Sequence, residues 1–238
     1  MEEAKIIEIQ EKHLRTIQQD FRFDLSDFNE YNSHANLIAG IANNYLSAEN
    51  RKFIVDDSNK KILRFLTYYF NGCSLCVKVF PDERYELHKN ILLIGSAGTG
   101  KTLLMQIFSD YLKYTRNPLY FKNISVTQIL NTQRNSGNID KYIYNEQNSS
   151  NFEGSPYHVC LNDIGIEREY EQKSFGTDLK NVIDDFLFAR YEIYQQQGVR
   201  YHLTSNLSVK DFKENYKFRL FDRFKSFNVL VLGGGSRR

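Results

Sequence analysis

The chain contains 238 residues, of which 41% are hydrophobic and 25% are charged, and this composition excludes a largely disordered protein. No apolar run approaches the roughly 18–20 residues that cross a membrane, and no signal-peptide core follows the acidic start, so we expect a cytoplasmic protein with no membrane partner. The 31 basic and 29 acidic residues leave a net charge of +2, which excludes a generally basic nucleic-acid coat but allows a local basic groove.

The first fifty residues contain one clear helical pattern. Ile7, Leu14 and Phe21 recur every seven residues among Glu, Lys and Gln, which predicts an amphipathic helix. Its apolar face could dock a partner or pack on the protein's own core. Residues 22–50 are mixed in composition and give only weak signals.

From Asn59 onward, helix and strand patterns alternate. Helical spacing predicts a helix that ends at Asn71-Gly72 and a second over residues 102–112. It also predicts a helix with an apolar face from Val182 to Tyr191 that stops near Gly198, and another after the capping pair Ser208 and Asp211. Five short, mainly apolar segments are predicted strands: residues 90–94, 119–121, 157–161, 201–204 and 229–232. Residues 131–156 are rich in Asn, Ser, Gln and Gly and are expected to form a long loop or a poorly ordered insertion. The alternation predicts an α/β fold, a five-stranded parallel sheet with helices on both faces.

The strongest motif lies between the first strand and the helix that follows it. The segment reads Gly95-Ser96-Ala97-Gly98-Thr99-Gly100-Lys101-Thr102 and fits the phosphate-binding pattern G-x-x-x-x-G-K-[ST]. Glycines let successive backbone N–H groups point at phosphate oxygens, beside a helix N-terminus. Lys101 would hold the β- and γ-phosphates and the Thr102 hydroxyl would bind Mg²⁺. The sequence therefore predicts binding of a nucleoside triphosphate.

Polar residues end the third and fourth strands. Asn162-Asp163 stands where P-loop ATPases carry acids that hold Mg²⁺ and polarise water, although a plain buried strand followed by a turn is the alternative. Because Asn162 is neutral, slow hydrolysis is expected. Asn206, in Thr204-Ser205-Asn206, could orient the attacking water, or it could simply serve a turn.

Two arginines follow near the C-terminus. Arg219 and Arg223 are four residues apart and would share a face if their segment is helical. Such an arginine could reach a neighbouring subunit's γ-phosphate and stabilise transition-state charge. A solvated or salt-bridged basic face is the alternative.

Three weaker features are a cysteine pair, a histidine within a strand and a run of basic and aromatic residues. Cys73-x-x-Cys76 resembles half a metal site, but two reduced, partly buried thiols are the favoured interpretation. His158 interrupts an apolar strand and is interpreted as structural. The run from Lys141 to Tyr144, with Arg134 upstream, suits contacts to single-stranded nucleic acid, but 16 Tyr and 18 Phe make such clusters common by chance.

Together these segments resemble the DnaC/DnaI helicase-loader and IstB-type branch of the AAA+ ATPases, over roughly residues 51–238. The resemblance rests on Gly95 to Thr102, on Leu161 to Glu167, on Leu203 to Ser208, on Arg190-Tyr191, on Arg219-x-x-x-Arg223 and on the ending Gly234-Gly235-Ser236-Arg237-Arg238. It implies an AAA+ domain at residues 51–238 and a small helical N-terminal extension at residues 1–50 for partner docking. It also implies ATP and Mg²⁺ as cofactors.

The resemblance also implies roles for single residues. Asn162 and Asp163 would occupy the Walker B positions, where the family usually carries an acid in place of Asn162. Asn206 would be sensor 1, Arg219 the arginine finger and Arg223 its companion. Arg238 would be a sensor-2-like terminal arginine.

Three functions are compatible with these features. The first is an ATP-dependent, self-assembling loader that delivers a replicative helicase to single-stranded DNA. The second is an IstB-type regulator of a transposase, which would share the same core. The third, suggested by Asn162, is a weakly hydrolysing or non-hydrolysing nucleotide-dependent assembly protein.

Overall fold

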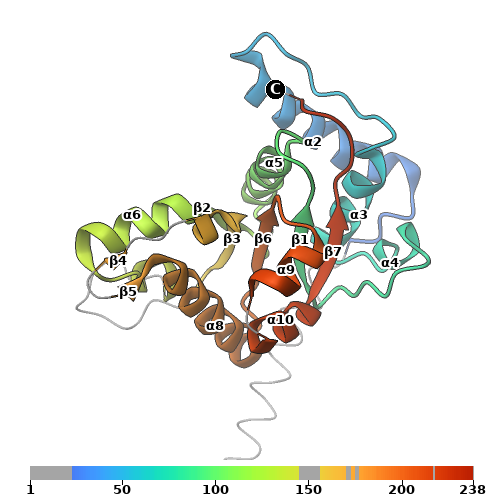
Figure 1. Cartoon of the computed structure of the whole chain (residues 1–238). Coiled ribbons are helices and arrows are strands. Elements are labelled where there is room, and N and C mark those ends of the chain that lie inside the picture. Colours follow the sequence, from blue (N-terminus) through green and yellow to red (C-terminus); the bar gives the residue numbers. More distant parts are fainter. Residues whose placement is uncertain (1–22, 145–155, 170–172, 175–176, 217, 238) are drawn as a thin grey trace, which may run out of the picture.

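The five predicted strands form one parallel sheet in the computed structural model, which describes residues 23–144, 156–169, 173–174, 177–216 and 218–237 (Figure 1). Its strands lie in the order β2-β3-β6-β1-β7, and all four neighbouring pairs are parallel. The strands are β1 (Asn90–Ile94), β2 (Phe121–Ser125), β3 (His158–Ile164), β6 (Tyr201–Ser205) and β7 (Phe227–Val231). A separate antiparallel pair joins β4 (Lys173–Ser174) to β5 (Thr177–Asp178). The predicted sheet and its parallel pairing are confirmed.

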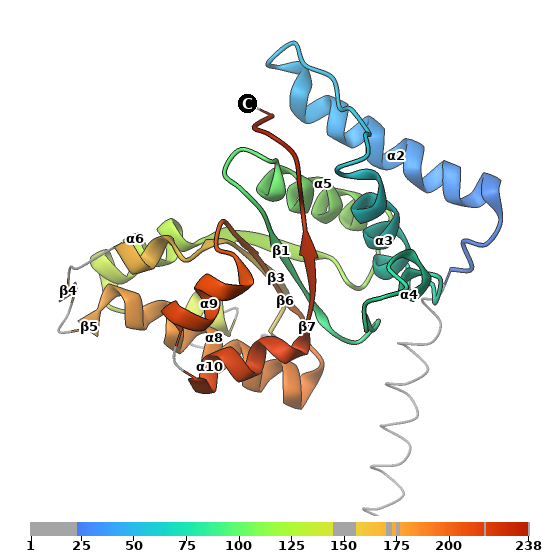
Figure 2. The same ribbon diagram turned by 45° about the vertical axis from the view of Figure 1, so that its right-hand side comes forward.

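Helices cover both faces of this sheet (Figure 2). One face carries α2 (Phe28–Ser47), α3 (Lys60–Phe70), α4 (Cys76–Val79) and α5 (Lys101–Tyr114). The other carries α6 (Val126–Ser136), α7 (Asp140–Ile143), α8 (Leu179–Gln197), α9 (Val209–Asn215) and α10 (Phe218–Arg223). Alternate residues of β1 serve the two faces, since Ile91 and Leu93 belong to the first cluster and Leu92 and Ile94 to the second. This double burial explains why the strand is apolar throughout its last four residues.

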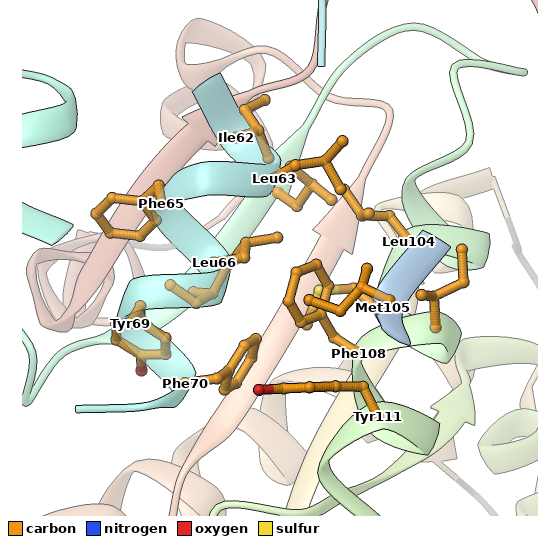
Figure 3. Packing of buried hydrophobic residues seen from close by; sticks show 14 of the residues in the cluster. Ile62, Leu63, Phe65, Leu66, Tyr69, Phe70, Leu104, Met105, Phe108 and Tyr111 are labelled. Carbon is orange, nitrogen blue, oxygen red and sulfur yellow. The ribbon is translucent and has the colours of Figure 1, made fainter. Parts of the chain in front are cut away.

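The core of the first face is the contact between α3 and α5 (Figure 3). Side chains from α3, among them Leu66 and Phe70, point toward Met105 and Phe108 of α5. The predicted helix is confirmed: its last residue is Phe70, its C-cap is Asn71, and Gly72 follows with φ 65°. This packing fixes α5, whose first residue is Lys101.

Helix α2 lies in the stretch that gave only weak signals. Asp27 caps it by accepting hydrogen bonds from the N–H groups of Asn29 and Glu30, and Ile38 and Ala42 are buried against the core. The hydroxyl of Tyr111 on α5 lies 2.5 Å from His34 Nδ1. The described part of the predicted extension therefore packs on the α/β core, while the predicted helix at residues 7–21 lies outside the described residues.

Two other expectations need correction. Residues 131–136 and 140–143 are helical and not loop, because Ser125 and Gln128 form a capping box that begins α6. Residues 145–155 of the expected loop lie outside the described residues. The second strand begins at Phe121 and runs to Ser125, later than predicted, because its edge position leaves Lys122 and Asn123 only half-buried and breaks the apolar pattern. None of the helices in the described ranges is long and apolar enough to cross a membrane.

Candidate nucleotide-binding site

The phosphate-binding motif forms the loop between β1 and α5. Gly100 directly precedes α5 and provides no side-chain cap, so the first N–H groups of the helix face the loop. The predicted residues Ala97, Gly98, Thr99, Gly100, Lys101 and Thr102 line a pocket of about 580 Å³. Gly95 and Ser96 instead present their carbonyl groups to Lys101.

Lys101 is almost completely buried and is held by three oxygen acceptors. Its Nζ donates to the carbonyls of Gly95 at 2.7 Å and Ser96 at 2.9 Å, and to Oδ1 of Asn206 at 2.7 Å. Asn206 directly follows β6, the strand that pairs with β1. The structure thus brings together the motif lysine and the predicted sensor residue.

Asp163 reaches the same pocket because β3 is irregular near its end. The pairing of β3 with β6 shifts register between Leu161 and Ile164, and Asp163 has a left-handed φ of 64°. Its N–H donates to Thr204 Oγ1 at 3.0 Å. Asp163 and Thr102 both line the pocket, and their carboxylate and hydroxyl oxygens are ligands of the kind that Mg²⁺ prefers, so these residues fit the metal.

Asn162 has different surroundings from Asp163. It is buried between strands, where its amide donates to Asn123 Oδ1 at 3.2 Å and its carbonyl accepts from Thr204 Oγ1 at 3.2 Å. It is not one of the described residues that line the pocket. The role of Asn162 as a metal ligand therefore stays a prediction, and its side chain does not lie in the pocket lining.

Other pocket walls come from distant parts of the chain. Leu46 of α2, Phe53 and Ile54 supply apolar surface beside the motif, and Leu232 adds to it from the segment after β7. Arg237 also lines the pocket. Sequence reasoning missed these roles, because no local pattern indicates contacts across about 180 residues.

Arg237 ties the C-terminal segment to the segment before α3. Its guanidinium donates to both carboxylate oxygens of Asp56, at 2.9 and 2.7 Å, and to Ser58 Oγ at 2.6 Å. Its backbone N–H donates to the Gly98 carbonyl at 2.9 Å. Gly98 has φ 82°, and a Cβ there would lie 2.5 Å from Ser236 Oγ, so only glycine fits under this segment. Arg238 lies outside the described residues.

The arginines of α10 lie away from this pocket within the same chain. Arg219 is exposed and makes no hydrogen bond or ion pair with the described residues. Arg223 packs on α8, with its guanidinium carbon 4.3 Å from the centre of the Phe188 ring and 4.5 Å from that of Tyr191. The segment is helical, as the shared face requires, but the two side chains have different surroundings.

The weaker features resolve mainly into structure. Cys73 and Cys76 are buried, burial raises the pKa of Cys76 to about 11, and the described residues hold no group of three or more potential metal ligands among His, Cys, Asp and Glu. His158 Nδ1 accepts from the N–H of Arg200 at 2.6 Å, which confirms its structural interpretation. The Lys141 ammonium lies 4.9 Å from the centre of the Tyr142 ring on α7, and its nucleic-acid role stays a prediction.

One buried polar cluster was not anticipated. Glu167, which is fully buried, accepts hydrogen bonds from the Gly165 N–H and the Tyr216 hydroxyl, and burial raises its pKa. Arg168 forms an ion pair with Asp184 of α8. Glu167 stands in a segment that carries the family resemblance, but only the fold shows that Tyr216 lies against it.

Comparison with solved structures finds proteins with a similar fold. DnaI matches with a TM-score of 0.51 and 17% identity, covering 79% of this chain and 89% of its own. AMPPCP-bound DnaA from Aquifex aeolicus matches with a TM-score of 0.50 and 17% identity over 76% of this chain, which spans only 48% of that protein. The DnaC helicase loader matches with a TM-score of 0.49 and 16% identity, covering 76% of this chain and 93% of its own. No protein-family model and no curated protein matches the sequence. At these identities the likeness shows an AAA+-type fold.

Proposed function

We propose that the protein is an ATPase that binds ATP and Mg²⁺ in the pocket at the end of β1. The observation that carries this proposal is the convergence of Lys101, Thr102, Asp163 and Asn206 on one pocket. The loop N–H groups and Lys101 would hold the phosphates, and Thr102 and Asp163 would hold Mg²⁺. Bound Mg²⁺ neutralises phosphate charge, and Asn206 would orient the attacking water. The apolar wall at Phe53 and Leu232 offers surface for the base.

The remaining predicted residues have secondary roles in this proposal. Arg219, exposed on α10, would act on the nucleotide of a neighbouring copy in an ATP-dependent homo-oligomer. Arg223 would support α10 through its stacking on α8. The proposed roles of Arg238 and of Asn162 as a metal ligand rest on the family resemblance.

At the level of biology, we propose a loader that places a replicative helicase on single-stranded DNA. Its support is the order of motifs along the chain together with a fold like that of DnaI. An IstB-type transposition regulator is compatible with the same core. A weakly hydrolysing assembly protein is favoured by one observation, the burial of Asn162 away from the pocket.

Nucleotide binding is tested with a fluorescent ATP analogue, titrated with and without Mg²⁺. Lys101→Ala should weaken binding by about tenfold or more, because it removes the charge that faces the phosphates. Lys113→Ala, on the exposed end of the same helix, is the matched control and should bind as the wild type does. Equal affinity of Lys101→Ala and wild type would overturn the assignment of the pocket.

The client is tested in two steps. Anisotropy of labelled single-stranded DNA should show ATP-dependent binding that weakens with salt, and no binding in any nucleotide state would exclude the DNA role. Copurification with a helicase or with a transposase then separates the two DNA-directed functions.

The role of Arg219 is tested by Arg219→Ala. This variant should lose ATP hydrolysis while ATP binding stays largely intact, and normal hydrolysis by the variant would exclude Arg219 as the arginine finger.

A further inference from the structure

The turn that carries Asp163 into the pocket is held at both ends. At its start, the Asp163 N–H is bonded to Thr204 of β6. At its end, Gly165 has φ 108°, and its N–H donates to Glu167 Oε2 at 2.7 Å. A Cβ on Gly165 would lie 2.6 Å from the side chain of Leu207, so the turn and the segment after β6 leave no space for a larger residue here. The direction of the Asp163 side chain therefore depends on these two attachments.

Glu167 connects this turn to the segment that carries Arg219. Its other oxygen accepts the hydroxyl hydrogen bond of Tyr216, the residue that directly follows α9 and stands two residues before α10. Tyr216 is itself buried and stacks on Phe212, with ring centres 5.4 Å apart. The carboxylate is thus a fixed link between the end of β3 and the α9–α10 region.

Arg168 holds the same cluster from the other side. Its guanidinium carbon lies 4.0 Å from the centre of the Tyr216 ring, and it is paired with Asp184 of α8. Its Nε forms an ion pair with Glu167 Oε1 at 3.3 Å without a hydrogen bond, while Gly165 and Tyr216 donate hydrogen bonds to the Glu167 carboxylate. Burial of the Glu167 carboxylate has a desolvation cost, which the hydrogen bonds from Gly165 and Tyr216 and the ion pair with Arg168 offset.

We propose that Glu167 is a positioning residue, which aims Asp163 at the Mg²⁺ of the bound nucleotide and is itself held by the Tyr216 hydroxyl. Glu167 is not one of the described residues that line the pocket, so it acts through the Gly165 turn and not by contact with the metal. The inference rests on the proposed nucleotide site. Residues that orient a metal ligand in this way typically change metal affinity by about 10–100-fold when they are replaced.

The test measures how much Mg²⁺ strengthens binding of the fluorescent ATP analogue. Glu167→Gln keeps the size of the side chain, but it replaces one of the two acceptor oxygens with an amide NH₂ group, so it can accept a hydrogen bond from only one of Gly165 and Tyr216. Tyr216→Phe removes only the hydroxyl. Both variants should keep the wild-type affinity without Mg²⁺ and lose about tenfold of the Mg²⁺-dependent gain. The double variant should lose no more than either single one, because both act on one link.

Tyr111→Phe is the matched control. It also removes a buried tyrosine hydroxyl with hydrogen-bond partners, but that hydroxyl contacts Asn71 and His34, away from the pocket. It should keep the full Mg²⁺ effect. Urea denaturation of all variants shows which of them are folded. If Glu167→Gln does not fold, Tyr216→Phe still tests the inference, because it keeps the ring that packs on Phe212.

The outcomes separate this inference from the proposed function. An unchanged Mg²⁺ effect in both variants, or an equal loss in Tyr111→Phe, would overturn the positioning role alone. ATP binding by the wild type without any Mg²⁺ effect would overturn both the positioning role and the proposed Mg²⁺ site, but not ATP binding in the pocket. Absence of ATP binding by the wild-type protein would overturn the proposed function and, with it, this inference.

Discussion

Asn162 and Asp163 are adjacent at the end of β3, yet their side chains serve different parts of the molecule. In a regular strand, neighbouring side chains point to opposite faces of the sheet. Here the register shift and the left-handed φ of Asp163 turn its carboxylate into the pocket, while Asn162 stays between β2 and β6. The neutral residue therefore fits a position that is rich in hydrogen-bond acceptors.

This difference predicts the effect of Asn162→Asp. The Asn162 amide nitrogen now donates to the Ile124 carbonyl oxygen at 3.5 Å and to Asn123 Oδ1. A buried carboxylate oxygen in its place would face these two acceptors, and the Asn123 side chain would have to rotate to donate to it. We expect the free energy of unfolding to fall by about 1–2 kcal/mol, measured by urea denaturation. Asn162→Ser, which removes the amide without adding charge, is the control. Wild-type stability combined with a stronger Mg²⁺ effect on ATP binding would instead support a metal ligand at this position.

The sequence predicts those site residues that lie in continuous motifs. The loop from Gly95 to Thr102 was readable because its chemistry needs a fixed local order of residues. Arg237, Asp56 and Leu46 were not assigned to the pocket, because their roles depend on tertiary contacts between distant segments. Glu167 has no local signal for its partner, since Tyr216 is 49 residues away.

At the scale of elements, apolar periodicity predicted the sheet and helices α3, α5 and α8. Strands buried on both faces and helices with one apolar face give strong patterns, as in β1 and α3. Helix α2 contains five asparagines and has a weaker pattern, so its formation depends on its cap at Asp27 and on packing against α5. Local sequence therefore gave little indication of the helix that completes one wall of the pocket.

The packing of α2 is tested by Ile38→Ala. Ile38 is 3% exposed within the cluster that joins α2 to α5, so the substitution should lower the free energy of unfolding by about 2–4 kcal/mol. Asn36→Ala, on the exposed face of the same helix, should change it by no more than about 0.5 kcal/mol. Similar small effects for both variants in urea denaturation would mean that α2 does not dock on the core.

Two histidines in the strands β3 and β6 lead us to expect a loss of stability in acid. His158 on β3 and His202 on β6 are held neutral by burial, which lowers the pKa of His158 to about 4 and that of His202 well below its ordinary value. The unfolded chain takes up these protons near pH 6.5, while the folded protein does so only at lower pH. The unfolded state therefore binds more protons in this window, and stability falls as pH drops from 6.5 toward 4.

The expected fall between pH 6.5 and 5 is on the order of 3 kcal/mol for the two histidines together, measured by urea denaturation at each pH. His158→Asn keeps an acceptor for the Arg200 N–H and should remove about half of this dependence. The exposed His88→Asn should leave it unchanged. A dependence that His158→Asn does not reduce would mean that other groups control acid stability.

At the scale of the whole molecule, two segments that are far apart in the chain meet beside the phosphate-binding loop. The segment at residues 54–58 and the segment at residues 232–237 are joined by Arg237 and Asp56, and the second also binds the Gly98 carbonyl (Figure 1). Both segments line the pocket through Ile54 and Arg237. Because this ion pair is partly exposed, its main effect is expected on the geometry of the pocket and not on global stability.

Arg237→Ala and Asp56→Ala should therefore each weaken ATP binding by roughly threefold to tenfold, because the nucleotide must then order two loosened walls. The measurement is the Kd and dissociation rate of the fluorescent analogue, and dissociation should become faster. Lys60→Ala breaks a neighbouring ion pair, with Asp57, that does not touch the pocket, and should leave both values unchanged. Exchanging the charges, with Asp56→Arg and Arg237→Asp in one chain, should recover part of the lost affinity if the pair acts as a clasp. If Arg237→Ala weakens binding but Asp56→Ala does not, Arg237 acts on the nucleotide directly, and the closing of the pocket by the two segments is not what retains ATP.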